Sequence, residues 1–392
     1  MRPGQIAALV VGVTVAACGS HTTALDPIVM AYDTTTADTV SKLLLLNIAR
    51  ARHNEPMHFT TVSSIVATYK FTVSGGFVAA AAGDRGFLPV PQLGGSTEEN
   101  PTISIAPMQG DEFTQRLLTP FEGTKLTLLL RQGYDVDTLF RLLGGEILIA
   151  DSDRASVSYG NHPADRAGYT MFRRIVAHLS SIQDEHALHV EPLRFIHTWT
   201  VPAATITPES FSTTYKDFSL ALDSVAQTYK VTKRVDGRVV VTNYDPQVLS
   251  NEDRVRLHEE AEGMSFNDVL LDIRAGYPGG TFPMHGRLRL RSFHEVLTFI
   301  GRGIEEEPEF DVAKDPRTPT ISENPSHTLD IVEASQPPHG AGVSVTLHGM
   351  TYTIRPQHGY QWNRKAFDVL YQLYQMSVAT MVNAGPAITI GK

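Results

Sequence analysis

Residues 229–242 read Tyr-Lys-Val-Thr-Lys-Arg-Val-Asp-Gly-Arg-Val-Val-Val-Thr, with β-branched runs on both sides of Asp236-Gly237. Asp-Gly in this setting is typical of a two-residue type I′ turn, because glycine adopts the positive φ angle that the turn needs. The stretch therefore predicts an antiparallel β-hairpin. Residues 286–291, Gly-Arg-Leu-Arg-Leu-Arg, alternate strictly and predict another strand, and Ser292 predicts the N-cap of a helix from Phe293 to about Gly303.

Amphipathic helices accompany these strands. Apolar residues recur at three- and four-residue steps in 37–53, 169–189 and 362–381, and each run predicts a helix with one buried face. In the last run the apolar positions are Phe367, Leu370, Tyr371, Tyr374 and Val378. Together the patterns predict an α+β fold, with antiparallel hairpins packed with amphipathic helices in two or three subdomains.

The remaining segments give less regular patterns. Lys70–Val78 predicts a strand, whereas 88–107 is rich in Pro and Gly and predicts a long surface loop with a short strand at 102–105. Residues 110–150 predict helix in two pieces, the second reaching Ile149 with breaks at Gly133 and Gly144-Gly145. Strands are expected at 328–333 and 342–354, with a turn at Gly349. The acidic, proline-rich 305–326 predicts a linker or an exposed loop.

Composition excludes several classes of protein. The chain has 392 residues, a net charge of −9 and a single cysteine. The negative charge argues against binding a phosphate backbone, so we expect no nucleic acid partner. One cysteine excludes an intrachain disulfide framework, a zinc finger and an iron–sulfur cluster.

The N-terminus has the features of an export signal. Met1-Arg2 is followed by the uncharged run Ile6–Ala17, which is too short for a transmembrane helix and has the length of a secretory h-region. The run ends in Val15-Ala-Ala-Cys18-Gly19. No uninterrupted apolar stretch after Cys18 approaches 18 residues; Val73–Gly83, about 11 residues long, comes nearest. We therefore expect no other segment to cross a bilayer.

Val15–Cys18 resembles the lipobox of bacterial lipoproteins, in which an apolar residue and two small ones precede a cysteine. The resemblance covers residues 1–18 only, and the mature chain resembles no characterised family. It implies cleavage before Cys18, attachment of a diacylglycerol to the thiol, and acyl chains such as palmitate that anchor the protein to a membrane. Gly19 in place of Asp implies the outer membrane rather than the inner one, with the body facing the periplasm.

These features divide the chain into five expected ranges. Residues 1–17 form the signal peptide, 18–38 a lipidated, Thr-rich tether, 39–150 an N-terminal mixed α/β region, 151–310 a central α+β region, and 311–392 a C-terminal hairpin plus helix.

Signatures of catalysis are missing from the sequence. It contains no Gly-x-Ser-x-Gly, no Ser-x-x-Lys, no His-Glu-x-x-His and no phosphate-binding Gly-rich loop. We therefore expect no catalytic residues and no cofactor.

One cluster offers metal ligands: His178, Glu185, His186 and His189. On a helix His178, Glu185 and His189 share a face at steps of seven and four, and two His with a carboxylate suit zinc or non-haem iron. The alternative, which we favour, is a solvated polar face opposite the apolar stripe from Phe172 to Ile182.

Two functions remain open. The first is a lipid-anchored cell-envelope protein that binds or scaffolds an envelope protein partner without catalysis. The second is a lipid-anchored envelope hydrolase with a His/carboxylate site.

Overall fold

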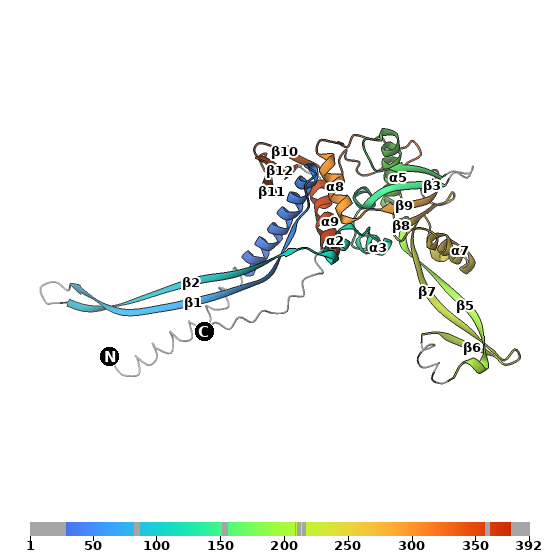
Figure 1. Cartoon of the computed structure of the whole chain (residues 1–392), viewed down its shortest axis with the longest axis horizontal. Coiled ribbons are helices and arrows are strands. Elements are labelled where there is room, and N and C mark those ends of the chain that lie inside the picture. The colour runs from blue at the N-terminus through green and yellow to red at the C-terminus, as the bar shows by residue number, and fades with distance from the viewer. Residues whose placement is uncertain are drawn as a thin grey trace. The chain divides into compact units, whose positions relative to one another are not determined.

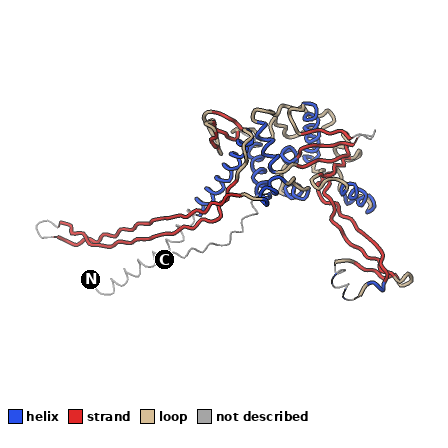
Figure 2. The backbone as a smooth tube through the Cα atoms, viewed as in Figure 1, coloured by secondary structure: helices blue, strands red, loops and turns tan. Residues whose placement is uncertain are grey.

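The computed structural model describes residues 29–81, 87–150, 156–207, 209, 213, 217–356 and 361–377, and confirms an α+β fold (Figures 1 and 2). The described residues form two compact units. Residues 29–43 and 58–113 belong to the first unit, and 44–57 and 114–377 belong to the second. Among the described residues no helix is both long enough and apolar enough to cross a membrane.

The first unit contains a two-stranded sheet. β1 (Phe59–Ala81) pairs antiparallel with β2 (Phe87–Met108), from Phe59 opposite Met108 to Ala81 opposite Phe87. The prediction of a surface loop over 88–107 is wrong, because this stretch is the second strand of the hairpin. Proline is compatible with a strand that has a neighbour on one side only, so the prolines of β2 do not prevent pairing with β1.

A helix over residues 29–52 begins earlier than the predicted start at Ala37. The hydroxyls of Thr34, Thr35 and Thr36 donate to the carbonyls of the residues four positions before them, at 2.7 to 2.8 Å. These bonds satisfy the polar side chains inside the helix, so the Thr-rich composition does not exclude helix here. Residues 29–38 of the expected tether are therefore helical.

The second unit is built on a seven-stranded sheet in which the strand order is β4-β3-β9-β8-β7-β5 and β6 also pairs with β7. Its strands are β3 (Gly144–Ala150), β4 (Ser156–Gly160), β5 (His189–Pro202), β6 (Ser219–Asp223), β7 (Thr228–Thr242), β8 (Asp268–Ile273) and β9 (Met284–Leu290). Only β7 and β8 pair in parallel. Every residue of β8 is buried, as expected of a central strand. The predicted ranges 39–150 and 151–310 both contribute strands to this sheet.

The predicted turn at Asp236-Gly237 is wrong, because β7 continues through these residues, with a shift in its register against β5 between Asp236 and Val239. Gly237 has a different role. A Cβ at this position would lie 2.7 Å from Nδ1 of His258 on α7 (Asn251–Glu262) and 3.0 Å from the ring of Phe195. The glycine therefore lets a helix approach the strand closely, which is a second reason for glycine in a sheet.

The other helices are α2 (Asp111–Leu118), α3 (Gly123–Arg131), α4 (Val136–Leu143), α5 (Arg166–Asp184), α8 (Phe293–Gly303) and α9 (Trp362–Ser377), with short 3₁₀ turns η2 (Ala203–Thr205) and η3 (Pro246–Val248). Among them α3, α4 and α5 contact strands of the sheet. The predicted helix over 139–149 ends at Leu143, and Gly144 begins β3. A Cβ on Gly144 would lie 2.5 Å from the Phe140 carbonyl and 2.9 Å from Leu288, so only glycine fits this junction. The capped helix α8 has the predicted bounds, and Ser292 and Glu295 form a capping box.

The C-terminal strands and helix form close to where they are predicted, except that the first strand begins at Ile331 rather than at Thr328. β10 (Ile331–Ala334), β11 (Ser344–Leu347) and β12 (Met350–Ile354) form a small sheet with His348-Gly349 at the turn. Helix α9 contacts α4 and α8 and buries Leu370 and Tyr374, whereas Tyr371 is half-buried. Val378 lies outside the described residues.

Candidate functional site

The four predicted metal candidates do not share a helix face, because α5 ends at Asp184. Glu185 is its C-cap, His186 occupies the following turn with a φ of 57°, and His189 begins β5. His178 is fully buried, so the expectation of a solvated polar face at this position is wrong. The structure therefore does not bring the four residues together.

Both ring nitrogens of His178 are engaged within the protein. Nε2 lies 2.8 Å from the carbonyl of Gly279 and Nδ1 lies 3.2 Å from the hydroxyl of Thr318. A carbonyl only accepts, so Nε2 carries the proton and Nδ1 accepts from Thr318. Burial lowers the pKa of His178, which favours this neutral form. His178 therefore joins α5 to two loops and has no free lone pair for a metal.

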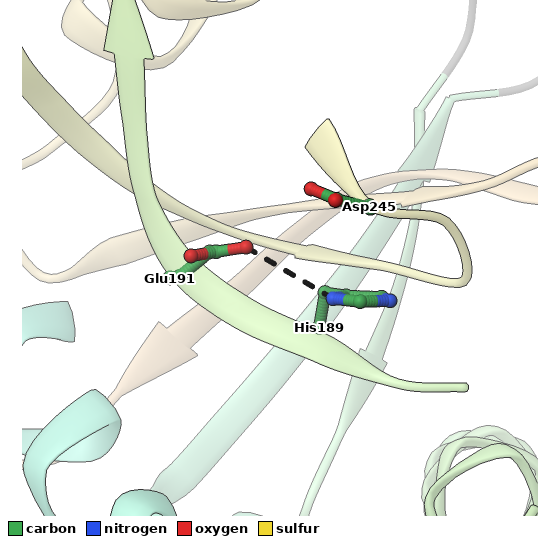
Figure 3. A group of neighbouring side chains, drawn as sticks. All are labelled: His189, Glu191 and Asp245. Atoms are coloured by element: carbon green, nitrogen blue, oxygen red, sulfur yellow. Dashed lines mark ion pairs between the residues drawn. The ribbon is translucent and has the colours of Figure 1, made fainter. Parts of the chain in front are cut away.

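His189 lies instead beside Glu191 and Asp245 (Figure 3). One ligand atom from each residue lies within 4.8 Å of the other two, and Nδ1 of His189 is 3.9 Å from Glu191 Oε1. An imidazole and two carboxylates are ligands of the kinds that bind zinc in proteins. Asp245 also accepts a hydrogen bond from the Gln247 backbone at 2.8 Å, which caps η3.

A second group of titratable side chains surrounds Asp272. This carboxylate accepts from Tyr244 at 2.5 Å and Arg274 at 2.7 Å, and Nδ1 of His285 lies 3.1 Å from it. Nε2 of His285 lies 2.7 Å from Glu260. The hydrogen bond to Asp272 raises the pKa of His285 to about 9. A protonated imidazole has no lone pair, so at neutral pH His285 serves neither as a general base nor as a metal ligand.

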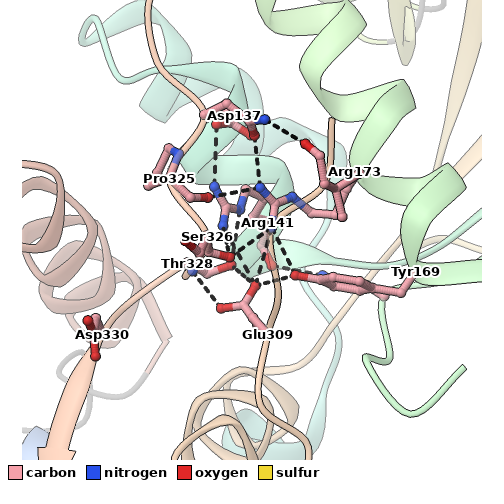
Figure 4. Close-up of polar contacts among 12 residues, drawn as sticks. Asp137, Arg141, Tyr169, Arg173, Glu309, Pro325, Ser326, Thr328 and Asp330 are labelled. Carbon is pink, nitrogen blue, oxygen red and sulfur yellow. Dashed lines mark hydrogen bonds and ion pairs between the residues drawn. The ribbon is translucent and has the colours of Figure 1, made fainter. Parts of the chain in front are cut away.

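A buried group of charged side chains lies between α4, α5 and the segment 309–328 (Figure 4). Glu309 lies 3.7 Å from Arg141 and 3.9 Å from Arg173, and accepts from the hydroxyl of Tyr169 at 2.6 Å. Asp137 lies 3.6 Å from Arg141. The predicted linker or exposed loop over 305–326 is therefore wrong from Glu309 onward, because these contacts fasten the segment to two helices.

This cluster is closed to substrates. The guanidinium groups donate to the backbone carbonyls of Pro325 and Ser326, and Thr328 donates to Glu309. Its ionisable side chains are 9% exposed or less, with Tyr169 fully buried, whereas Pro325 and Ser326 are half-buried. Its role is to hold the structure together.

A cavity of about 520 Å³ between β3, β9 and α8 has the size of a small-ligand pocket. Two of the arginines that line it, Arg289 and Arg291, already have partners. Arg289 pairs with Glu146 and Asp268, and the buried Arg291 donates to the carbonyls of Arg141, Leu142 and Asn161. These contacts give Arg289 and Arg291 a structural role.

The outer part of the β5–β7 ladder leaves the sheet of the second unit, with β6 at its end (Figure 1). We define the arm as residues 196–202 of β5, 228–234 of β7, and β6. One face holds a small aromatic group, in which Trp199 contacts His197 and Phe218 with ring centroids 5.2 and 5.5 Å apart. Val231, which lies opposite Trp199 on β7, is fully buried.

The outer edge of β5 is covered along only part of its length. Asn251 of α7 bonds both the N–H and the carbonyl of Ile196, at 2.7 and 3.0 Å, in the manner of a neighbouring strand. Beyond Ile196, the described part of the chain places no strand beside β5 except β7. Thr198 and Thr200 are exposed there. An uncovered edge presents unpaired backbone groups to other chains.

We did not predict this edge from the sequence. The run Phe195-Ile-His-Thr-Trp-Thr-Val201 is rich in β-branched and aromatic residues, which is the signal that indicates a strand. Cys18, the expected lipid attachment site, lies outside the described residues. No protein-family model, curated protein or solved structure matches this chain.

Proposed function

We propose that this chain is a lipid-anchored component of a bacterial cell envelope that acts without catalysis, by binding an envelope protein at the arm. The uncovered edge of β5 beyond Ile196 carries the proposal. An extended segment of a partner can add there as a further strand, with backbone hydrogen bonds for affinity and side chains at alternate positions for specificity. The lipobox-like Val15–Cys18 supports the location, with the body facing the periplasm of an outer membrane.

Photo-crosslinking in intact envelopes tests the arm. A photoreactive amino acid at Thr198 or Thr200 is expected to yield one discrete cross-linked protein, whereas the same amino acid at Glu259, exposed on α7, is expected to yield none. Equal cross-linking at Glu259, or none at the edge, contradicts the proposal.

Proline provides the matched variants. Adjacent residues of a strand point their N–H groups to opposite sides of the strand. Of the two variants Thr198→Pro and Trp199→Pro, one therefore removes an N–H group at the outer edge, and the other removes a hydrogen bond to β7. The variant that keeps the melting temperature is expected to lose the cross-link. A cross-link that survives in this variant overturns strand addition.

A lipid-anchored hydrolase is the second candidate, favoured by the His189–Glu191–Asp245 group. Metal analysis of the purified chain separates the two functions. Stoichiometric zinc or iron that is lost in His189→Ala supports the hydrolase, and a metal-free protein supports binding.

A further inference from the structure

The β1–β2 hairpin is long and has no third strand among the described residues. A lone two-stranded hairpin is marginally stable in water at best, and both of its edges carry unpaired N–H and C=O groups. Paired strands of this length therefore need an additional environment that stabilises them.

The register gives the hairpin two unlike faces. Alternate residues of a strand share a face, so the odd-numbered positions of β1 lie on one face with the residues opposite them. From Phe71 to Ala81 these positions are Phe71, Val73, Gly75, Phe77, Ala79 and Ala81, opposite Thr97, Gly95, Leu93, Pro91, Pro89 and Phe87. The other face contains Thr72, Ser74 and Gly76, and Gly76 lies opposite Gln92. One face is thus almost wholly apolar and the other is mixed.

Charged residues mark the limits of this stretch. Lys70, Glu98 and Glu99 lie at its base, and neither 71–81 nor 87–97 contains a charged residue. Each of these two ranges is about 11 residues long, and a tilted strand needs about 9–11 residues to span the hydrocarbon core of a bilayer.

We propose that residues 71–81 and 87–97 insert into a lipid bilayer as paired strands, with the face that holds Phe71, Val73 and Phe77 towards the lipid. The expectation that nothing after Cys18 crosses a bilayer counted only continuous apolar runs long enough for a helix, and alternating strands escape that count. This inference goes beyond the proposed binding at the arm and does not depend on it.

Insertion into a bilayer requires hydrogen-bond partners for the backbone groups at the edges of the hairpin. Hydrocarbon offers no hydrogen bonds, so the outer edges of β1 and β2 need partner strands. Further copies of this chain supply the same hairpin with the same charge-free length. Pro89 and Pro91 carry no N–H, so β2 has fewer donors to satisfy.

Fluorescence from single introduced cysteines tests the orientation. Cys18 is the only cysteine, so the full chain with Cys18→Ser has no other thiol to label. Cysteines placed one at a time at 71–77 carry an environment-sensitive dye, and vesicles of phosphatidylethanolamine and phosphatidylglycerol are added. We expect the emission to rise at 71, 73, 75 and 77 and to change little at 72, 74 and 76. No rise at any position, or an equal rise on both faces, overturns the proposal.

Two adjacent glycines provide a matched pair at the middle of the stretch. Gly75 lies on the apolar face opposite Leu93, and Gly76 lies on the mixed face opposite Gln92. A lysine on a lipid-facing position near the bilayer midplane lowers insertion by about 30-fold or more. We expect Gly75→Lys to abolish the emission rise of the dye at position 77 and Gly76→Lys to keep it. Equal loss in both variants overturns the assignment of faces, and the arm cross-link of either variant is expected to be unchanged.

Discussion

Two arginines and two carboxylates share the buried space between α4, α5 and residues 309–328. Burial alone raises the pKa of Glu309, but Arg141 and Arg173 bring it below its ordinary value. Glu309 is therefore the anion that compensates both guanidinium groups. Removing one partner of such a group leaves the others uncompensated in a medium of low polarity.

Glu309→Gln is accordingly expected to lower the free energy of unfolding by about 3–5 kcal/mol. Denaturant titration followed by circular dichroism measures the loss. Glu306→Gln is the matched control, because Glu306 is half-exposed and its pairing with Arg302 contributes at most about 1 kcal/mol. Similar losses in the two variants would show that the buried cluster does not hold the segment.

His285 makes stability depend on pH on the alkaline side. Its pKa is raised from 6.5 to about 9 in the folded protein, because it bonds Asp272 and Glu260. A group whose pKa is higher in the folded protein contributes its full stabilisation at pH values below its unfolded-state pKa. This contribution is lost as the pH rises through about 9. Unfolding midpoints measured between pH 6 and pH 10 are expected to fall, and His285→Gln should reduce this fall. A fall of the same size in the variant would exclude His285 as its origin.

At the scale of elements, α9 is expected to be indispensable to the core. Leu370 is fully buried on α9, which contacts α4 and α8, so Leu370→Ala loses apolar contact and leaves a cavity, at a cost of about 2–5 kcal/mol. Thermal unfolding measures this effect, and Gln372→Ala on the half-buried side of α9 is the control. Unchanged melting of Leu370→Ala would assign the helix to partner binding instead of the core.

Helices and strands could be predicted where the local sequence pattern is compatible with only one structure. Helix α8 follows from Ser292 and the spacing of Phe293, Val296, Leu297 and Ile300, and β9 follows from its strict alternation. Asp236-Gly237 is compatible with two structures, because glycine is required both at a type I′ turn and where a helix packs closely against a strand. Only the position of His258, which is distant in the sequence, distinguishes them.

The candidate sites depended on the same non-local information. Spacing along α5 placed His178 and His189 on one face, but the helix ends at Asp184 and the ligand atoms near His189 come from Glu191 and Asp245. Glu309 looked solvated because its neighbours are acidic and proline-rich. Its burial follows from Arg141 and Arg173, which belong to other elements.

At the scale of the whole molecule, two separate attachments to a membrane are proposed. The lipobox-like stretch predicts acyl chains at Cys18, and two or more such chains, at about 0.8 kcal/mol per buried CH₂, would anchor the protein stably without any strand. The proposed insertion of 71–81 and 87–97 adds a second attachment with a different chemistry. Each attachment can therefore be removed while the other remains.

Cys18→Ser is expected to abolish the incorporation of labelled palmitate, because a hydroxyl does not form the thioether that carries the diacylglycerol. It should leave the larger, unprocessed precursor, which gel electrophoresis detects. Gly75→Lys with Cys18 intact is the matched variant: it should keep both the label and the membrane fraction, since the lipid alone suffices. Label retained by Cys18→Ser would refute lipid attachment at this cysteine, and release of labelled Gly75→Lys from membranes would show that the hairpin, not the lipid, carries the anchoring energy.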